Sequence, residues 1–125
     1  YLVLGATISL KEGNLEEIKT LTRELREKRT SKQPLEFPSA GSTFKRPEGY
    51  FAGKLIMDSG LRGCQIGGAR VSDKHCGFVI NAGDATAEDV VSLMKHVTEV
   101  VREKYGVTLE PEVKFLGEFD KKCDW

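Results

Sequence analysis

Ser42 carries a hydroxyl group with a glycine on one side and two cations, Lys45 and Arg46, within four residues on the other. A glycine beside a hydroxyl group allows a bulky ligand to approach closely. Nearby cations suit the phosphate or carboxylate groups of such a ligand. Segment 38–47 is therefore a candidate anion-binding loop, although a Ser-Thr turn with two solvated cations explains the same residues.

Glu112 and His75 are further candidates by residue type. Glu112 follows Pro111 inside an otherwise apolar, strand-like pattern. A carboxylate there is either a catalytic group or simply exposed to water, and its type alone favours exposure. His75, taken alone, is explained as an ordinary structural histidine.

Several familiar motifs do not fit the sequence. Cys64, His75 and Cys76 match no zinc-ligand spacing, so we expect no metal site. The glycines of segment 63–68 do not have the spacing of a dinucleotide-binding loop, and segment 41–47 lacks the ending of a phosphate-binding loop. The flanks of Ser42 also differ from the nucleophile elbow of acyl-transfer enzymes.

Length and charge exclude several classes of protein. The chain has 125 residues, the size of one domain, and 19 basic side chains balance 19 acidic ones. A zero net charge argues against a nucleic-acid partner, and no apolar run is long enough to span a membrane. We expect a cytoplasmic protein with reduced thiols, because its odd number of cysteines, 3, forms no paired pattern. The first residue, Tyr1, suggests part of a longer polypeptide.

Residues 2–10 are apolar and β-branched, which predicts a strand, and a turn follows them. Asn14 should cap a helix that fades near Arg29 or Thr30. The charged residues of this helix predict a solvated outer face. Its apolar residues recur at helical spacing: Leu15, Ile18, Leu21 and Leu25.

The middle of the chain is irregular. Segment 31–49 holds Pro34, Pro38 and Pro47, which exclude a long helix or a central strand there. Its aromatic residues predict a loop fixed to the core. A short helix over 50–59 should follow, ended by Gly60.

The second half alternates between strand and helix patterns. After a glycine-rich stretch, residues 77–81 predict a buried strand, and Thr86 should cap a helix that Gly106 ends. Further strand segments are predicted over 107–109 and 112–116, before a polar tail. The pattern indicates the α+β class, with a small mixed sheet covered by helices.

Five segments in order resemble the UDP-N-acetylenolpyruvoylglucosamine reductase family of peptidoglycan synthesis. The order of five blocks is more specific than any single block. The resemblance covers that family's C-terminal, substrate-binding domain. The matching segments are 38–47, 52–56, 66–72, 74–81 and 109–114 with 117–118.

The resemblance implies a domain division. Residues 1–13 look like the last strand of a preceding flavin-binding domain, 14–119 like the substrate-binding domain, and 120–125 like a tail. The flavin domain of the same polypeptide is then a partner, and no membrane or nucleic acid is expected.

The resemblance also implies chemistry. The family reduces UDP-GlcNAc-enolpyruvate to UDP-N-acetylmuramate, with NADPH as hydride donor and FAD as carrier. The family's proton donor, a serine or cysteine, falls on Ser42, and its catalytic glutamate falls on Glu112. Such a serine must reach the accepting carbon, and such a carboxyl must be held partly protonated by its surroundings.

Arg46 and His75 match positions at which the family presents polar groups to the substrate. An arginine used by the family lies in the flavin domain, so the 125-residue chain alone is expected to be inactive and to bind no cofactor tightly. Segment 47–53 is too short for the loop with a substrate-clamping aromatic found in some members. This is typical of the short-loop subfamily.

Two other functions fit the residues. The same loop could hold a nucleotide sugar without redox chemistry, as a non-catalytic binding module. The helix beginning at Asn14 could instead serve an interaction domain. A flavin-binding segment upstream of Tyr1 would distinguish the enzyme from the module.

Overall fold

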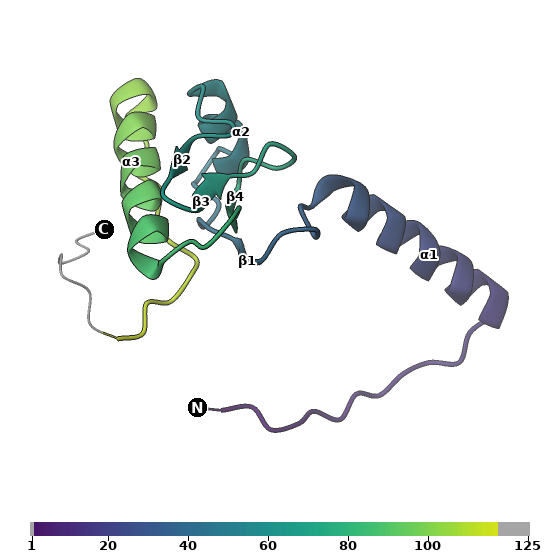
Figure 1. Ribbon diagram of the computed structural model, residues 1–125. Helices are drawn as coiled ribbons and strands as arrows, with labels where there is room; N and C mark the ends of the chain where they lie inside the picture. Colours follow the sequence, from purple (N-terminus) through teal and green to yellow (C-terminus); the bar gives the residue numbers. More distant parts are fainter. Residues whose placement is uncertain (1, 118–125) are drawn as a thin grey trace. The chain divides into compact units, whose positions relative to one another are not determined.

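The computed structural model describes residues 2–117. The chain divides into two compact units, of which one ends at Ser31 and the other begins at Lys32. The first unit holds most of one helix, and the second holds a sheet with two helices (Figure 1). None of the helices in the described part is long and apolar enough to cross a membrane.

Helix α1, Leu15–Lys32, lies in the first unit except for its last residue. The predicted cap is confirmed, because the Asn14 side-chain oxygen accepts from the backbone N–H groups of Glu16 and Glu17 at 2.9 and 3.2 Å. The helix runs slightly beyond the predicted end. No residue of α1 is buried, and the apolar stripe is 51–62% exposed.

The strand predicted over residues 2–10 is absent from the structure, where this stretch has no regular secondary structure. A strand needs a neighbour to satisfy its backbone N–H and C=O groups. No described strand pairs with these residues, so the pattern of β-branched side chains alone was insufficient.

The second unit is built on a four-stranded sheet in the order β1-β4-β3-β2. The α+β class is confirmed, but every strand pair is antiparallel, so the sheet is not mixed as predicted. The β2–β3 and β3–β4 connections are too short for the crossovers that parallel strands require, whereas a longer segment that contains α2 joins β1 to β2. The strands are β1 Ser39–Ser42, β2 Gln65–Ile66, β3 Ala69–Val71 and β4 Phe78–Asn81.

Strand β1 lies at the sheet edge, which agrees with the exclusion of a central strand near the prolines. Ser39 pairs with Ile80 and Ser42 with Phe78, so three steps along β1 oppose two along β4. The extra residue makes a bulge, and Gly41 inside it has φ 84°. Bulges redirect the side chain that follows, which here is Ser42.

The glycine-rich stretch, predicted only as irregular, folds into the β2–β3 hairpin. Gly67 and Gly68 make its two-residue turn, and Gly67 has φ 53°. The Gly68 N–H donates to the Asp89 carboxylate at 3.3 Å. Each strand has only two or three residues, too few for a periodic pattern in the sequence.

Helix α3, Ala87–Tyr105, has the predicted boundaries. Thr86 and Asp89 form a complete capping box, and Gly106 ends the helix with φ 67°. The helix packs against β2, β3 and α2 (Figure 1). Its fully buried side chains form the centre of the core: Leu93, Met94, Val97 and Val101.

Helix α2 spans Ala52–Asp58, slightly less than predicted, and Gly60 follows with φ 80°. Leu55 and Ile56 are buried on its inner face. The outer residues Gly53, Lys54 and Met57 line a cavity. This short helix thus joins the core to the candidate site.

The strands predicted over 107–109 and 112–116 are not formed. One isolated bridge joins Phe44 to Pro111. A proline has no N–H to continue a ladder, which explains why pairing stops there. The predicted tail 120–125, and the last two residues of the predicted domain 14–119, lie outside the described residues.

Candidate functional site

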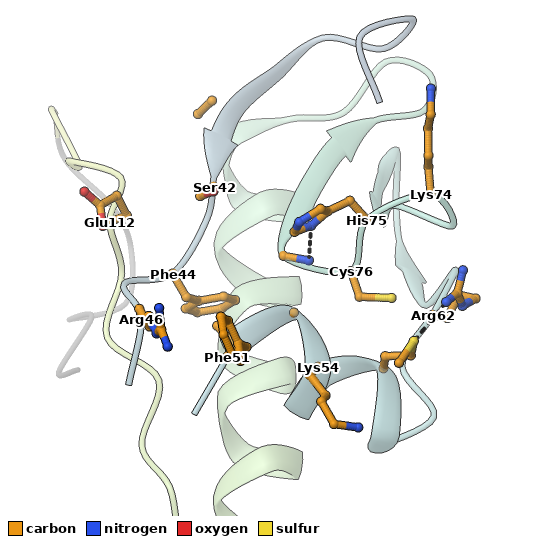
Figure 2. A pocket seen from close by; sticks show the side chains of 15 residues that line it. Ser42, Phe44, Arg46, Phe51, Lys54, Arg62, Lys74, His75, Cys76 and Glu112 are labelled. Atoms are coloured by element: carbon orange, nitrogen blue, oxygen red, sulfur yellow. Dashed lines mark hydrogen bonds between the residues drawn. The ribbon is translucent and has the colours of Figure 1, made fainter. Parts of the chain in front are cut away.

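A cavity of about 750 Å³ opens beside β1, α2 and the β3–β4 turn. It contains all four candidate residues: Ser42, Arg46, His75 and Glu112. In the view of Figure 2, Ser42 lies between Glu112 and His75. Residues that were separate candidates in the sequence therefore share one cavity.

Backbone pairing brings Ser42 and Glu112 to the same wall. The Glu112 N–H donates to the Thr43 carbonyl at 2.9 Å, and the Lys45 N–H donates to the Glu110 carbonyl at 2.8 Å. Two hydrogen bonds thus fix the register between residues 43–45 and 110–112.

Thr43 also joins this wall to the sheet. Its side chain is buried, and its hydroxyl accepts from the Val79 N–H at 2.8 Å. Its own N–H donates to the Gly77 carbonyl at 2.9 Å. The residue after Ser42 is thereby held at a definite depth.

The candidate acid–base side chains are accessible. Ser42 and Glu112 are both exposed in this chain. The described residues therefore do not supply the burial that a partly protonated carboxyl requires. A ligand or another domain would have to cover Glu112 to provide it.

Arg46 is held in a defined orientation. Its guanidinium carbon lies 4.0 Å from the centre of the Phe51 ring, and its Nε donates to the Tyr50 carbonyl at 3.3 Å. Stacking on an aromatic ring and a fixed Nε leave the two terminal amino groups for a bidentate anion. Phe51, whose ring is exposed, lines the cavity with it.

The cavity wall is strongly cationic. Among its described lining residues Glu112 is the one carboxylate, against the four cations Arg46, Lys54, Arg62 and Lys74. A chain of zero net charge thus concentrates positive charge at one place, which attracts anionic ligands.

These cations have protein partners. Lys54 pairs with Asp58 at 2.8 Å, and this hydrogen bond raises the pKa of the lysine. Lys74 lies 3.6 Å from the Glu36 carboxylate. Arg62 donates to the Asp73 carbonyl. It also donates to the Met57 sulfur at 3.0 Å (Figure 2). The side chains are therefore oriented at the rim before a ligand arrives.

Cys76 lines the same cavity but is only 5% exposed. Burial raises the pKa of its thiol, and the nearby Arg62 charge opposes that shift. A raised pKa keeps the sulfur as the less reactive thiol at neutral pH. Cys76 thus belongs to the wall rather than to the reactive groups.

Sequence reasoning missed several wall residues. Lys54, Lys74 and Cys76 lie inside the segments that carry the family resemblance, but their types alone gave no role. Arg62 lies between two such segments. A search for polar residues of these segments on the outer face of the predicted helix 50–59 would have identified Lys54.

The glycine-rich stretch does not form a binding loop for a flavin dinucleotide. The one glycine-rich stretch that might have cradled a dinucleotide is a hairpin, and its Gly68 N–H is bonded to Asp89. In the described range 2–117, no three His, Cys, Asp or Glu side chains are grouped to hold a metal ion. The cations that line the cavity suit an organic anion.

Comparison with known proteins agrees with the cavity's position in the fold. The family model for the C-terminal domain of UDP-N-acetylenolpyruvoylglucosamine reductase matches residues 33–116. This range contains the whole cavity lining. It also begins close to the division between the two units.

Two curated relatives carry the name UDP-N-acetylenolpyruvoylglucosamine reductase. That of Lachnoclostridium phytofermentans is 65% identical over 118 residues, covering 94% of this chain and 38% of the relative. That of Agathobacter rectalis is 63% identical over 119 residues, covering 95% and 38%. The chain thus spans about 38% of the length of these relatives.

A solved structure shows the same fold. The crystal structure of UDP-N-acetylenolpyruvylglucosamine reductase from Thermus caldophilus matches 83% of this chain and 37% of its own, at 39% identity and a TM-score of 0.68. The family model matches more than half of the chain, including every residue of the cavity. Residues 33–116 match the C-terminal domain of the UDP-N-acetylenolpyruvoylglucosamine reductase family, and the chain therefore belongs to this family.

Proposed function

We propose that this chain is the substrate-binding part of a reductase that converts UDP-GlcNAc-enolpyruvate to UDP-N-acetylmuramate. The observation that carries the proposal is the cationic cavity that contains Ser42, Arg46, His75 and Glu112 together. The substrate is an anion with a diphosphate and a carboxylate. Its charge complements the cavity wall.

The cations divide the substrate between them. Arg62, Lys54 and Lys74 lie on the rim and suit the diphosphate, because charge-assisted hydrogen bonds to phosphate are strong. Arg46 is oriented by Phe51 and suits a planar carboxylate or a phosphate, with two parallel hydrogen bonds. The enolpyruvyl group would then lie near Ser42 and Glu112.

Ser42 is the proposed proton donor. Reduction of the vinyl group adds a hydride to one carbon and a proton to the other. The Ser42 O–H bond breaks as the new C–H bond forms, which leaves an alkoxide to be reprotonated. Glu112, on the paired segment, would stabilise or protonate the enolate once the bound substrate and a neighbouring domain bury its carboxyl.

The hydride would come from FAD, reduced by NADPH, and both would bind in the rest of the polypeptide. The relatives are longer than this chain and provide room for such a domain. We assign the exposed stripe of α1 and the unpaired residues 2–10 to contacts with that domain. The complete enzyme would work in the cytoplasm, where thiols such as Cys64 and Cys76 stay reduced.

The proposal is tested first by binding. Isothermal titration of UDP-GlcNAc-enolpyruvate into the complete polypeptide should show about tenfold or greater weakening for Arg62→Ala, the loss expected for a charged hydrogen bond. Arg102→Ala removes the same charge from the last turn of α3, which does not line the cavity, and should leave binding unchanged. Equal effects of both variants, or no binding at all, would contradict the assignment.

The remaining alternative is a non-catalytic nucleotide-sugar module. It predicts the same titration but no product. Incubation of the complete polypeptide with substrate and NADPH distinguishes the two, because the reductase releases UDP-N-acetylmuramate.

A further inference from the structure

We infer that His75 is held as the tautomer with its proton on Nε2, and that this N–H is a fixed donor to an oxygen of the ligand. Gly53, Gly77 and Phe78 form the seat of its ring. The tautomer follows from the structure alone. The donor role rests on the proposed function.

The tautomer is fixed by a hydrogen bond at the other ring nitrogen of His75, Nδ1. The backbone N–H of Gly77, a buried residue, donates to Nδ1 of His75 at 3.1 Å (Figure 2). A nitrogen that accepts a hydrogen bond carries no proton of its own. In a neutral imidazole the proton is then on Nε2, which becomes a donor.

Packing and the backbone of its turn fix the position of the His75 ring. The ring packs edge-on against Phe78, with centroids 5.0 Å apart and an interplanar angle of 72°. This geometry is a favourable aromatic contact. The backbone of the same turn is tied down, because the buried Ser72 hydroxyl accepts from the N–H groups of Lys74 and His75, each at 3.2 Å.

Gly53 and Gly77 leave the space that the His75 ring occupies. A Cβ on Gly77 would lie 2.9 Å from Cε1 and 3.1 Å from Nδ1 of His75. A Cβ on Gly53, in α2, would lie 3.3 Å from Cε1 of His75 and 3.1 Å from the Gly77 nitrogen. Any larger residue at position 77 would push the ring away from its hydrogen bond.

The His75 ring is accessible from the cavity. His75 is exposed although one edge of its ring is packed, and it lines the cationic cavity. In Figure 2 the ring extends from the β3–β4 turn toward Ser42. A neutral donor there complements the neighbouring cations, because it can bind a phosphate, carboxylate or carbonyl oxygen without adding charge. Gly53 and Gly77 are thus positioning residues for a substrate-binding histidine.

Long-range ¹H–¹⁵N correlation spectroscopy of the 125-residue chain tests the tautomer. The chain has two histidines, and His96 on the exposed side of α3 is an internal reference. We expect His75 to show an unprotonated Nδ1 and a protonated Nε2 at neutral pH, and His96 to show exchange between forms. A proton on Nδ1 of His75, or averaging like that of His96, would overturn the inference.

Glycine variants test the seat. Gly77→Ala should abolish the fixed tautomer, and Gly53→Ala, with longer contacts, should weaken it while the chain stays folded. Gly5→Ala is the matched control, since no atom lies within 4 Å of its Cβ. Unchanged His75 signals in both variants would overturn the seat, and unchanged His96 signals show that the fold is intact.

Binding of UDP-GlcNAc-enolpyruvate to the complete polypeptide tests the donor. His75→Phe keeps a ring but loses the donor and should weaken binding about three- to tenfold, the range of one hydrogen bond. His75→Gln keeps an amide donor and should restore most of it. Equal affinity of all three proteins would overturn the donor role. No binding by any of them would contradict the proposed function and the donor role, while the tautomer measurement would still stand.

Discussion

Ser42 owes its place in the cavity to the glycine before it. Gly41 has φ 84°, a conformation costly for other residues, and it lies in the bulge that sets where Ser42 leaves the strand. On the opposite wall His75 depends on two more glycines, Gly53 and Gly77, for its space. The chemistry of single side chains here depends on neighbours that carry no functional group.

Cys76 provides a prediction at this scale. Because burial raises the pKa of its thiol above the ordinary 9.0, iodoacetamide should alkylate it slowly at neutral pH and faster as the pH rises through that value. Arg62→Gln removes the charge that opposes the shift, so alkylation should slow further. Mass spectrometry of the Cys76 peptide measures both rates. Rapid labelling at neutral pH would contradict the environment described for this thiol.

At the scale of elements, one carboxylate joins a helix to a hairpin. Asp89 accepts from the Thr86 N–H at 2.9 Å within the capping box of α3, and from the Gly68 N–H of the β2–β3 turn. A Cβ on Gly67 would clash with the same carboxylate. The double glycine is therefore needed for close contact between hairpin and helix, not for nucleotide binding.

Thr86→Ala should lower the free energy of unfolding by about 1 kcal/mol, the usual value of an N-terminal cap. Denaturant unfolding followed by circular dichroism measures it. Ser92→Ala, one turn into the same helix, is the matched control and should have a much smaller effect. A change below the error for Thr86→Ala would mean that the cap contributes nothing.

The same cap makes stability depend on pH. Hydrogen bonds from the backbone of Thr86 and of Gly68 lower the pKa of Asp89 below 3.8. A lowered folded-state pKa stabilises the fold fully above the ordinary value, and this contribution is lost as the pH falls through the lowered one. The Tm difference between the natural chain and Asp89→Asn should thus be constant near neutral pH and shrink below 3.8. A constant difference down to strongly acidic pH would contradict it.

At the scale of the whole molecule, the long regular elements were predictable and the short ones were not. Helix α3 is identified in the sequence by Thr86, Gly106 and a periodic apolar stripe. Strands of two to four residues carry no such pattern, and their pairing is decided by partners distant in the chain. Residues 2–10 show the opposite case, since they carry a strong β pattern but pair with no described strand.

The candidate site divides in the same way. Four of its residues were candidates by residue type and by the family resemblance, and the fold places them around one cavity. The cationic rim and the seat of His75 were not predictable, because they depend on which face of α2 and which edge of a turn meet in space. Such proximity is a property of tertiary structure alone.

The stripe on α1 provides the prediction at this scale. Leu21→Gln and Leu25→Gln should leave the helix content of the 125-residue chain unchanged, because these side chains are 56% exposed. In the complete polypeptide each should cost about 1.5–3 kcal/mol, the value of burying a leucine. Glu27→Gln, on the other face of the helix, is the control. Equal stability of all complete variants, by thermal unfolding, would refute the proposed contact.

Single-turnover kinetics of Ser42→Ala in the complete polypeptide test whether Ser42 delivers the proton. We expect NADPH still to bleach the flavin at the natural rate, whereas reduction of UDP-GlcNAc-enolpyruvate slows by about a hundredfold or more, the usual effect of losing a positioned acid. Ser42→Cys, which keeps a transferable proton, should recover part of the rate. Substrate reduction at the natural rate in Ser42→Ala would contradict the claim that this cavity is the site of proton delivery.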